Sequence, residues 1–298
     1  LANSKAINIA KGLISSNPNS IQPKVSERSL LNGMFIDEEM DFIRNALPKH
    51  TVEDVKRMIL TAQDLLVRAG LTEVHDAGIG PIEYQAYLEL ESEKKLNIRI
   101  YAMQNRDFFD NLGIEKTETG LFTSRSVKII YDGALGSRGA ALLDEYQDDP
   151  GNYGATQLTD KELLSIIKSA VSSNAQINIH AIGDRANRKV LDALEVALQG
   201  KEFLDHRTRI EHAQHVQLAD VKRLQRLKVI ASIQPAHYAD DISMAKKRLG
   251  VNRLHISYLW KTFIEQGVRV VYGSDSPVAT FNPIAGISSA VLSTGKHS

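Results

Sequence analysis

Cysteine is absent from the 298 residues of the sequence. This absence excludes disulfide bonds, thiolate metal ligands and a cysteine nucleophile. It also fits a reducing compartment, so we expect a cytoplasmic protein. No apolar run approaches the roughly 20 residues that a membrane-spanning helix needs. The first ten residues, LANSKAINIA, lack the basic and apolar regions of a signal peptide. We therefore expect no membrane partner.

An excess of charge of either sign is also missing. The sequence holds 36 Lys and Arg residues against 36 Asp and Glu residues. Nucleic acids and anionic membranes are bound mainly through a basic excess, so this balance argues against both as the main partner. Hydrophobic residues make up 43% of the sequence, which allows a substantial buried core.

Short runs of β-branched residues alternate with longer amphipathic segments from about residue 50 onward. Cap residues followed by acidic residues begin two of the helices, at Thr51 and Thr159. The pattern predicts strands at residues 71–75, 97–103, 126–131, 176–181, 208–211, 229–233 and 269–272. It predicts helices at residues 51–70, 81–95, 159–170, 184–198, 217–227 and 255–266, with a last one after Pro283.

Strands separated by helices of this length predict βαβ units and a parallel sheet. We predict an α/β fold, a (β/α)8 TIM-barrel-like structure in residues 51–298 preceded by an N-terminal extension or insertion in residues 1–50. A complete barrel needs eight strands. The Asn-, Ser- and Pro-rich first 50 residues offer no first strand, so we expect an incomplete barrel. A doubly wound sheet is the competing fold, but no Gly-rich dinucleotide loop follows any predicted strand.

Residues suited to metal chemistry stand at the ends of several predicted strands. His180 lies in INIHAIGD, His212 in RIEHAQ and Asp275 in VYGSDSP, each at the end of a predicted strand. Lys128 interrupts the apolar run in SVKIIYDG. In a barrel, the carboxyl ends of the strands face the active site. Histidine and aspartate suit zinc, iron or manganese.

Each of these residues also has an ordinary structural interpretation. A single histidine at a strand end is more often a hydrogen-bonded residue than a ligand. Asp275 alone fits a turn or a helix cap, and Lys128 alone fits an ion pair. Caps and turns explain poorly why three ligand-type groups stand at equivalent positions of three strands. We therefore favour a metal site.

At these residues the sequence resembles the amidohydrolase superfamily, and within it the amidohydrolase 3 or YtcJ-like group of metal-dependent hydrolases. The matching stretches run in family order from residue 1 to about residue 285: LANSKAINIA, LTEVHDAG, VKIIYDGALGSRGAALL, INIHAIGDRAN, RIEHAQHV, SIQPAHY and VYGSDSPV. The resemblance implies a (β/α)8 barrel with a small β-sandwich built from both chain ends.

The resemblance also implies one or two divalent metal ions, most often zinc, with iron or manganese as alternatives. His180 and His212 match metal ligands, and Asp275 matches a residue that binds metal and acts as the general base. Lys128 matches a lysine that is carbamylated in many relatives and bridges two metals.

Further positions match residues that contact the substrate or support the metal ligands in relatives. His237 corresponds to a residue at the substrate or its developing oxyanion. The others are Arg138, Asp184 and His75. A small-molecule substrate would be the partner.

The sequence departs from the family pattern in one respect. The family's first strand ends in His-x-His, and none of the nine histidines here makes that pattern. We expect a fragment that lacks strand 1 and the sandwich segments, with impaired activity, because fewer ligands hold a metal ion less well. Pairing through the open gap would give a homo-oligomer.

The function that follows is metal-dependent hydrolysis of a C–N bond of the amide type. Two other classes stay open. One is a binding or scaffold protein that kept the barrel without the chemistry. The other is a lyase or isomerase that uses Lys128 as a Schiff base.

Overall fold

We describe the chain from a computed structural model, which covers residues 1–16, 25–35, 37–201 and 204–293. The chain divides into two compact units, Leu1–Thr51 and Val52–Ser298. The smaller unit contains the helices α1 (Ser4–Ser16), α2 (Glu27–Asn32), η1 (Asp37–Met40) and α3 (Asp41–Arg44). Its small core is built on Ile7 and Ala10 of α1 and on the stacked rings of Phe35 and Phe42, whose centroids are 5.6 Å apart. We did not predict these helices.

The larger unit is built on one curved sheet. Its strands are β1 (Glu73–Ile79), β2 (Arg99–Gln104), β3 (Thr117–Thr119), β4 (Phe122–Ile130), β5 (Gln176–Ala181), β6 (Arg209–His212), β7 (Ile230–Ile233) and β8 (Val270–Tyr272). Seven strands are parallel in the order β1-β2-β4-β5-β6-β7-β8, and β3 pairs antiparallel to β4. Among the described residues β1 and β8 do not pair with each other. The prediction of an α/β, incomplete TIM-barrel-like fold is confirmed.

Helices follow most of these strands. They are α4 (Val52–Arg68), α5 (Pro81–Ser92), α6 (Arg106–Leu112), α7 (Asp160–Ser172), α8 (Asp184–Ala197), α9 (Leu218–Arg226), α10 (Pro235–Leu249), η2 (Val251–Ile256), α11 (Trp260–Glu265) and α12 (Pro283–Ser293). The capping box at Thr159 is confirmed, because the Thr159 hydroxyl accepts from the Glu162 N–H and the Glu162 carboxylate accepts from the Thr159 N–H. No helix within the described ranges is both long and apolar enough to cross a bilayer.

Two helix predictions need correction. The helix predicted at residues 255–266 is two pieces, η2 and α11, because Tyr258 between them has a φ of 55°, which lies outside helical geometry. The 15-residue helix α10 was not predicted. Pro235 begins it, in the first-turn position where a missing N–H costs no hydrogen bond.

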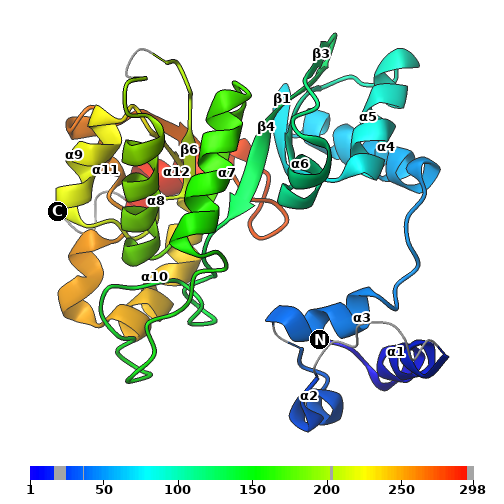
Figure 1. Cartoon of the computed structure of the whole chain (residues 1–298), viewed down its shortest axis with the longest axis horizontal. Helices are drawn as coiled ribbons and strands as arrows, with labels where there is room; N and C mark the ends of the chain where they lie inside the picture. The colour runs from blue at the N-terminus through cyan, green and yellow to red at the C-terminus, as the bar shows by residue number, and fades with distance from the viewer. Residues whose placement is uncertain (17–24, 36, 202–203, 294–298) are drawn as a thin grey trace. The chain divides into compact units, whose positions relative to one another are not determined.

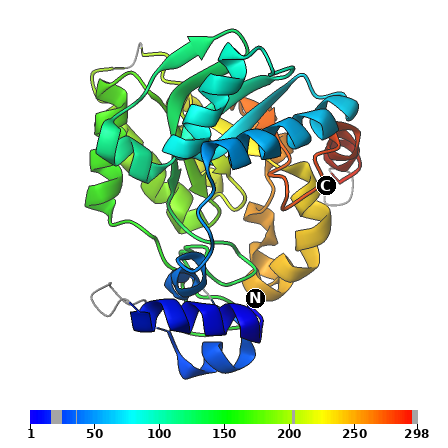
Figure 2. The ribbon, with the colours of Figure 1, turned by 90° about the vertical axis from the view of Figure 1, so that its right-hand side faces the viewer.

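The core lies between the centre of the sheet and the helices that cover its outer face. Val127 and Ile129 of β4 and Ile177 and Ile179 of β5 are fully buried. They belong to one cluster with the apolar faces of α7 and α8, which lie side by side on this part of the sheet (Figure 1). Near the edge of the sheet formed by β1, α4 and α5 pack against each other (Figure 2). The middle strands of the sheet therefore supply fully buried apolar side chains to this core.

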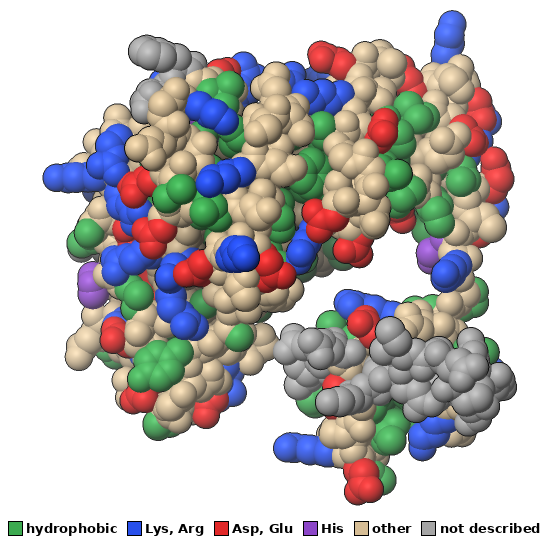
Figure 3. All heavy atoms as spheres, in the orientation of Figure 1, with side chains coloured by type: hydrophobic (Ala, Val, Ile, Leu, Met, Phe, Trp, Pro, Cys, Tyr) green, Lys and Arg blue, Asp and Glu red, His purple; other side chains and the backbone are tan. Residues whose placement is uncertain are grey.

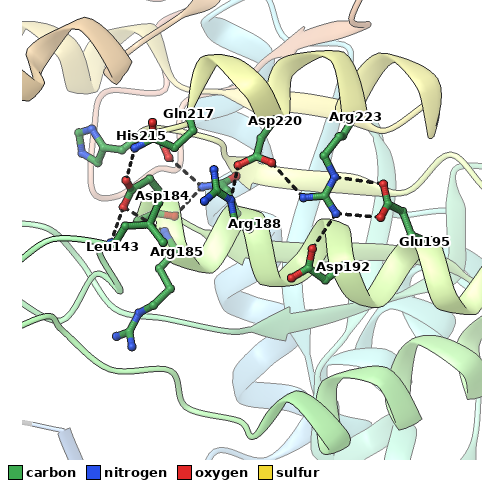
Figure 4. A network of polar contacts seen from close by, with 12 residues as sticks. Leu143, Asp184, Arg185, Arg188, Asp192, Glu195, His215, Gln217, Asp220 and Arg223 are labelled. Carbon is green, nitrogen blue, oxygen red and sulfur yellow. Dashed lines mark hydrogen bonds and ion pairs between the residues drawn. The ribbon is translucent and has the colours of Figure 1, made fainter.

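Charged side chains tie α8 to α9, the helices that follow β5 and β6 (Figure 4). The Arg223 guanidinium donates to Asp192 at 2.7 Å, to both Glu195 oxygens at 3.0 Å and to Asp220 at 2.9 Å. The buried Asp220 also accepts from Arg188 at 2.9 Å. This network fixes two neighbouring βα units relative to each other. Elsewhere on the larger unit, acidic and basic side chains are interspersed over the face in Figure 3, in keeping with the zero net charge.

His215 gives the metal-free chain a predictable dependence on pH. Its side chain is fully buried with Nδ1 2.9 Å from the Ser257 hydroxyl, and burial lowers its pKa from 6.5 to about 3. Below pH 6.5 the His215 ring is therefore protonated in the unfolded chain but stays neutral in the folded chain down to about pH 3. The free energy of unfolding falls as the pH drops through this range. Lowering the pH from 7 to 5 should cost about 2 kcal/mol through His215.

Urea unfolding at both pH values checks this expectation. His215→Gln should reduce the pH dependence by that amount, since glutamine does not titrate. An unchanged difference between pH 7 and pH 5 in the variant would contradict it.

Candidate metal centre

Three ligand-type side chains meet at the carboxyl ends of β6, β7 and β8. His212 is the last residue of β6, His237 lies in the first turn of α10 just after β7, and Asp275 follows β8. Each offers a ligand atom within 4.8 Å of the others. His237 Nε2 and Asp275 Oδ2 are 4.0 Å apart. Residues far apart in the sequence therefore converge as the barrel topology predicts.

The backbone holds two of these residues in an uncommon conformation. His212 has a φ of 76° and Asp275 a φ of 54°, both in the left-handed region. Such a residue costs of the order of 1–3 kcal/mol, and it persists only where the surroundings enforce it. Strain of this kind concentrates at functional sites, where it aims a side chain.

A hydrogen bond orients the His212 ring. Its Nδ1 lies 2.8 Å from Gln234 Oε1, and because an amide oxygen only accepts, Nδ1 carries the proton. The lone pair of the neutral ring is then on Nε2. Burial lowers the pKa of His212 well below 6.5, with help from the nearby His180 and Lys128. Gln234 was not among the predicted site residues, although its place directly after β7 was a signal.

His180 lies beside this group, near the end of β5. Its ring packs edge-on against His212, with centroids 4.5 Å apart. Burial, assisted by the charge of Lys128, lowers the pKa of His180 to about 4, so the ring is neutral at pH 7. The predicted ligands His180, His212 and Asp275 are thus brought near one another, but the group that fits around a single point contains His237 in place of His180.

Lys128 lies in β4, in register with Asn178 of β5, while Ile130 is in register with His180. Burial lowers the pKa of Lys128, and the charges of Glu211 and Asp275 oppose that shift. The Lys128 ammonium group is therefore close enough to the candidate centre to interact electrostatically with the carboxylates of Glu211 and Asp275. Glu211, directly before His212, was not predicted as a site residue, and the strand-end stretch RIEH contained the signal.

Asp132 is a third residue that the sequence analysis missed. Its carboxylate is fully buried and accepts hydrogen bonds from the backbone N–H groups of Ala141, Ile182 and Gly183 at 2.9, 3.0 and 2.9 Å. Its Oδ1 is 3.5 Å from His180 Nε2. Burial raises the pKa of Asp132 to about 7, and the three N–H groups oppose that shift. Asp132 joins the loop after β4 to the end of β5.

Arg138, in a loop, and Asp184, the first residue of α8, both make hydrogen bonds to other parts of the chain. Arg138, in the loop after β4, donates from Nε and Nη2 to the two oxygens of Asp148 at 3.2 and 3.1 Å. The buried Asp184 accepts from the Leu143 N–H at 3.0 Å and from Gln217 Nε2 at 2.6 Å (Figure 4). These bonds use both carboxylate oxygens of Asp184. Roles of the two residues at a substrate stay predictions.

His75 lies elsewhere in the sheet than the sequence pattern indicated. The strand predicted to end near His75 runs on to Ile79, because His75-Asp-Ala-Gly continues in extended backbone. His75 is therefore in the first half of β1, where its Nε2 is 3.1 Å from Glu73 and its Nδ1 is 2.7 Å from Arg209 Nη1. Its predicted contact with substrate stays untested.

The donor atoms at the carboxyl ends fit a divalent cation. His180 Nε2 and His237 Nε2 are both buried and have no hydrogen-bond partner among the described residues. A buried polar atom without a partner in the protein indicates a place where a water or an ion binds. Two imidazoles and a carboxylate at the carboxyl ends of three strands are ligands that zinc, iron and manganese accept.

A parallel half-barrel with histidine and aspartate at its carboxyl ends is the architecture of a TIM-barrel type of enzyme. The chain belongs to the amidohydrolase family, whose family model matches residues 1–297. This confirms the resemblance drawn from the motifs.

Similar proteins agree with this membership. The chain is 32% identical over 309 residues to Protein LONG AFTER FAR-RED 3 of Arabidopsis thaliana, covering 98% of this chain and 53% of that protein. It is 30% identical to the putative amidohydrolase YtcJ of Bacillus subtilis, covering 89% and 51%. An uncharacterized metal-dependent hydrolase from Pyrococcus furiosus superimposes with a TM-score of 0.79 at 28% identity, covering 97% and 58%. The chain spans about half the length of the curated relatives it matches.

Proposed function

We propose that the protein is a metal-dependent hydrolase that cleaves an amide-type C–N bond of a small molecule. The observation that carries this proposal is the convergence of His212, His237 and Asp275 within 4.8 Å at the carboxyl ends of three parallel strands. Membership of the amidohydrolase family supports it. Hydrolysis of a neutral amide needs a group that activates water and a group that takes its proton, and both kinds of residue are present.

One or two divalent ions, zinc in the first place, would be held by His212, His237 and Asp275 and by the adjoining His180. A carbamylated Lys128 would add an anionic oxygen ligand. A bound ion supplies Lewis acidity toward a carbonyl oxygen and toward water. Burial lowers the pKa of His180 and of His212, so these two rings offer lone pairs without prior loss of a proton. His237 was predicted to contact the substrate, and its position makes it a candidate ligand as well.

Asp275 would move the proton. Its side chain is 41% exposed, so substrate and water reach it, yet partial burial raises its pKa. A carboxylate of raised pKa is a better base than an ordinary aspartate while it stays ionised at neutral pH. It would accept a proton from the attacking water and return it to the leaving nitrogen. We propose that turnover is low in this chain, since His-x-His ligands are absent from its sequence.

A turnover assay on the metal-loaded chain tests the proposal. Wild type and Asp275→Asn would be loaded with zinc, manganese or iron and incubated with a panel of neutral amides, with metal content measured beside each assay. We expect turnover that a chelator abolishes and the same metal restores. Asp275→Asn should retain at most about a hundredth of it, the usual weight of a general base. Equal rates in both loaded proteins would indicate a non-catalytic barrel instead.

A further inference from the structure

A cavity of about 510 Å³ opens beside the candidate centre. Its walls are Ala236, in the first turn of α10, and the loop segment 276–281 between β8 and α12. Ala236 directly precedes His237, and Ser276 directly follows Asp275. The cavity and the centre are therefore built on the same two pieces of backbone. The helix α12, which follows the loop, packs against α10.

The chemistry of the walls differs from that of the centre. None of the described residues that line the cavity carries a charge. Pro277, Val278 and Phe281 are the larger apolar residues of the lining, and Ser276 and Thr280 are its hydroxyl-bearing residues. The volume lies within the roughly 300–1,000 Å³ of typical small-molecule sites, which are mainly apolar with a few polar groups.

Val278 is 74% exposed, although it is an apolar side chain and lies three residues after Asp275 of the candidate centre. Apolar surface that is open to water gains free energy when an apolar group covers it. A charged group would find no partner of opposite charge among the side chains of the lining. The lining therefore favours an apolar group over a charged one.

We propose that this cavity binds an uncharged, apolar substituent of the substrate while the scissile bond lies at His237 and Asp275. The inference rests on the proposed function and narrows it to amides that carry an aliphatic or aromatic group. Val278 and Phe281 are the residues that would determine this specificity. The position of the cavity, one residue from each of two members of the centre, places such a substituent next to the reacting carbon.

Binding of two probe amides to the zinc-loaded chain tests this. Phenylacetamide carries an apolar ring, and succinamate carries a carboxylate of comparable reach. Calorimetric titration should show that phenylacetamide binds at least tenfold more tightly than succinamate. Val278→Asp should weaken phenylacetamide binding at least tenfold. Val251→Asp is the matched control, because Val251 is also an exposed valine, at 63%, and lies outside the cavity.

The outcomes separate the two proposals. Equal binding of the two probes, no measurable phenylacetamide binding, or equal losses in Val278→Asp and Val251→Asp would each overturn the cavity assignment. Phenylacetamide binding that depends on Val278 supports the assignment even where no amide is hydrolysed, a result that would count against the proposed function alone. Hydrolysis of apolar and charged amides at equal rates would support the function and overturn the cavity.

Discussion

His212→Ala is expected to remove the divalent ion from the purified chain. His212 is the central member of the group, with its ring between those of His180 and His237 at centroid distances of 4.5 and 6.1 Å. Gln234 already fixes the proton on Nδ1, so Nε2 is the atom that would bind the ion. Removing one ligand from a set of three leaves too few donors for a stable site. Elemental analysis should show a stoichiometric ion in the wild type and less than a tenth of that amount in the variant.

An exposed histidine provides the control. His255 bonds the Asn252 carbonyl oxygen through Nδ1, outside the centre, and His255→Ala should leave the metal content unchanged. Far-ultraviolet circular dichroism would verify that the variants fold. A wild type that binds no ion, or an equal ion content in wild type and His212→Ala, would refute the expectation.

Two further variants separate the ligand set implied by family resemblance from the one that the geometry offers. The resemblance assigns His180 as a ligand, whereas the structure groups His237 with His212 and Asp275. If the geometry holds with metal bound, His237→Ala loses the ion and His180→Ala retains a part of it. If the resemblance holds, the order is reversed. The same elemental analysis decides between the two sets.

The fold could be predicted from the sequence because its strands are strongly patterned. The run from Gln176 to Ala181 alternates polar residues with isoleucine and alanine between clear helices, and its predicted bounds match β5. Weak patterns failed. α10 mixes apolar and charged residues without a clean stripe, and its first turn, Pro-Ala-His, was interpreted only as a functional motif. The strand β1 runs on to Ile79 but was predicted to end at His75, because Gly78 in HDAGIG resembles a turn signal.

Strand-end reasoning could locate the site but not its internal contacts. The rule that polar residues after parallel strands converge was enough to select His212 and Asp275. It could not show that Gln234 orients His212, since a glutamine after a strand is ordinary in any sequence. It also could not decide whether His180 or His237 lies closer to His212 and Asp275, because these distances depend on how strongly β5 and β7 curve. Partners of buried polar groups follow from three-dimensional packing.

Asp132→Ala is expected to destabilise the fold by roughly 3–5 kcal/mol. The Asp132 carboxylate satisfies three buried backbone N–H groups from two segments, Ala141 in one and Ile182 and Gly183 in the other. Alanine would leave all three donors without an acceptor. The space is too tight for water to replace the carboxylate freely, since a Cβ on Gly183 would lie 2.0 Å from the Ala141 carbonyl oxygen.

Urea unfolding measures this loss, and Asp144→Ala, in the same loop but exposed, should change stability by less than about 0.5 kcal/mol. Asp132→Asn should lose less stability than Asp132→Ala, because its amide oxygen can still accept from the Ala141 and Gly183 N–H groups, while its NH₂ group would face the Ile182 N–H. Ile182 and Gly183 follow His180 within three residues, so freeing their N–H groups loosens the segment that carries the histidine. Amide exchange at Ile182 and Gly183 should therefore accelerate in Asp132→Ala before global unfolding. A loss below about 1 kcal/mol, with protection at both amides intact, would mean that the loop and β5 are held together by packing instead.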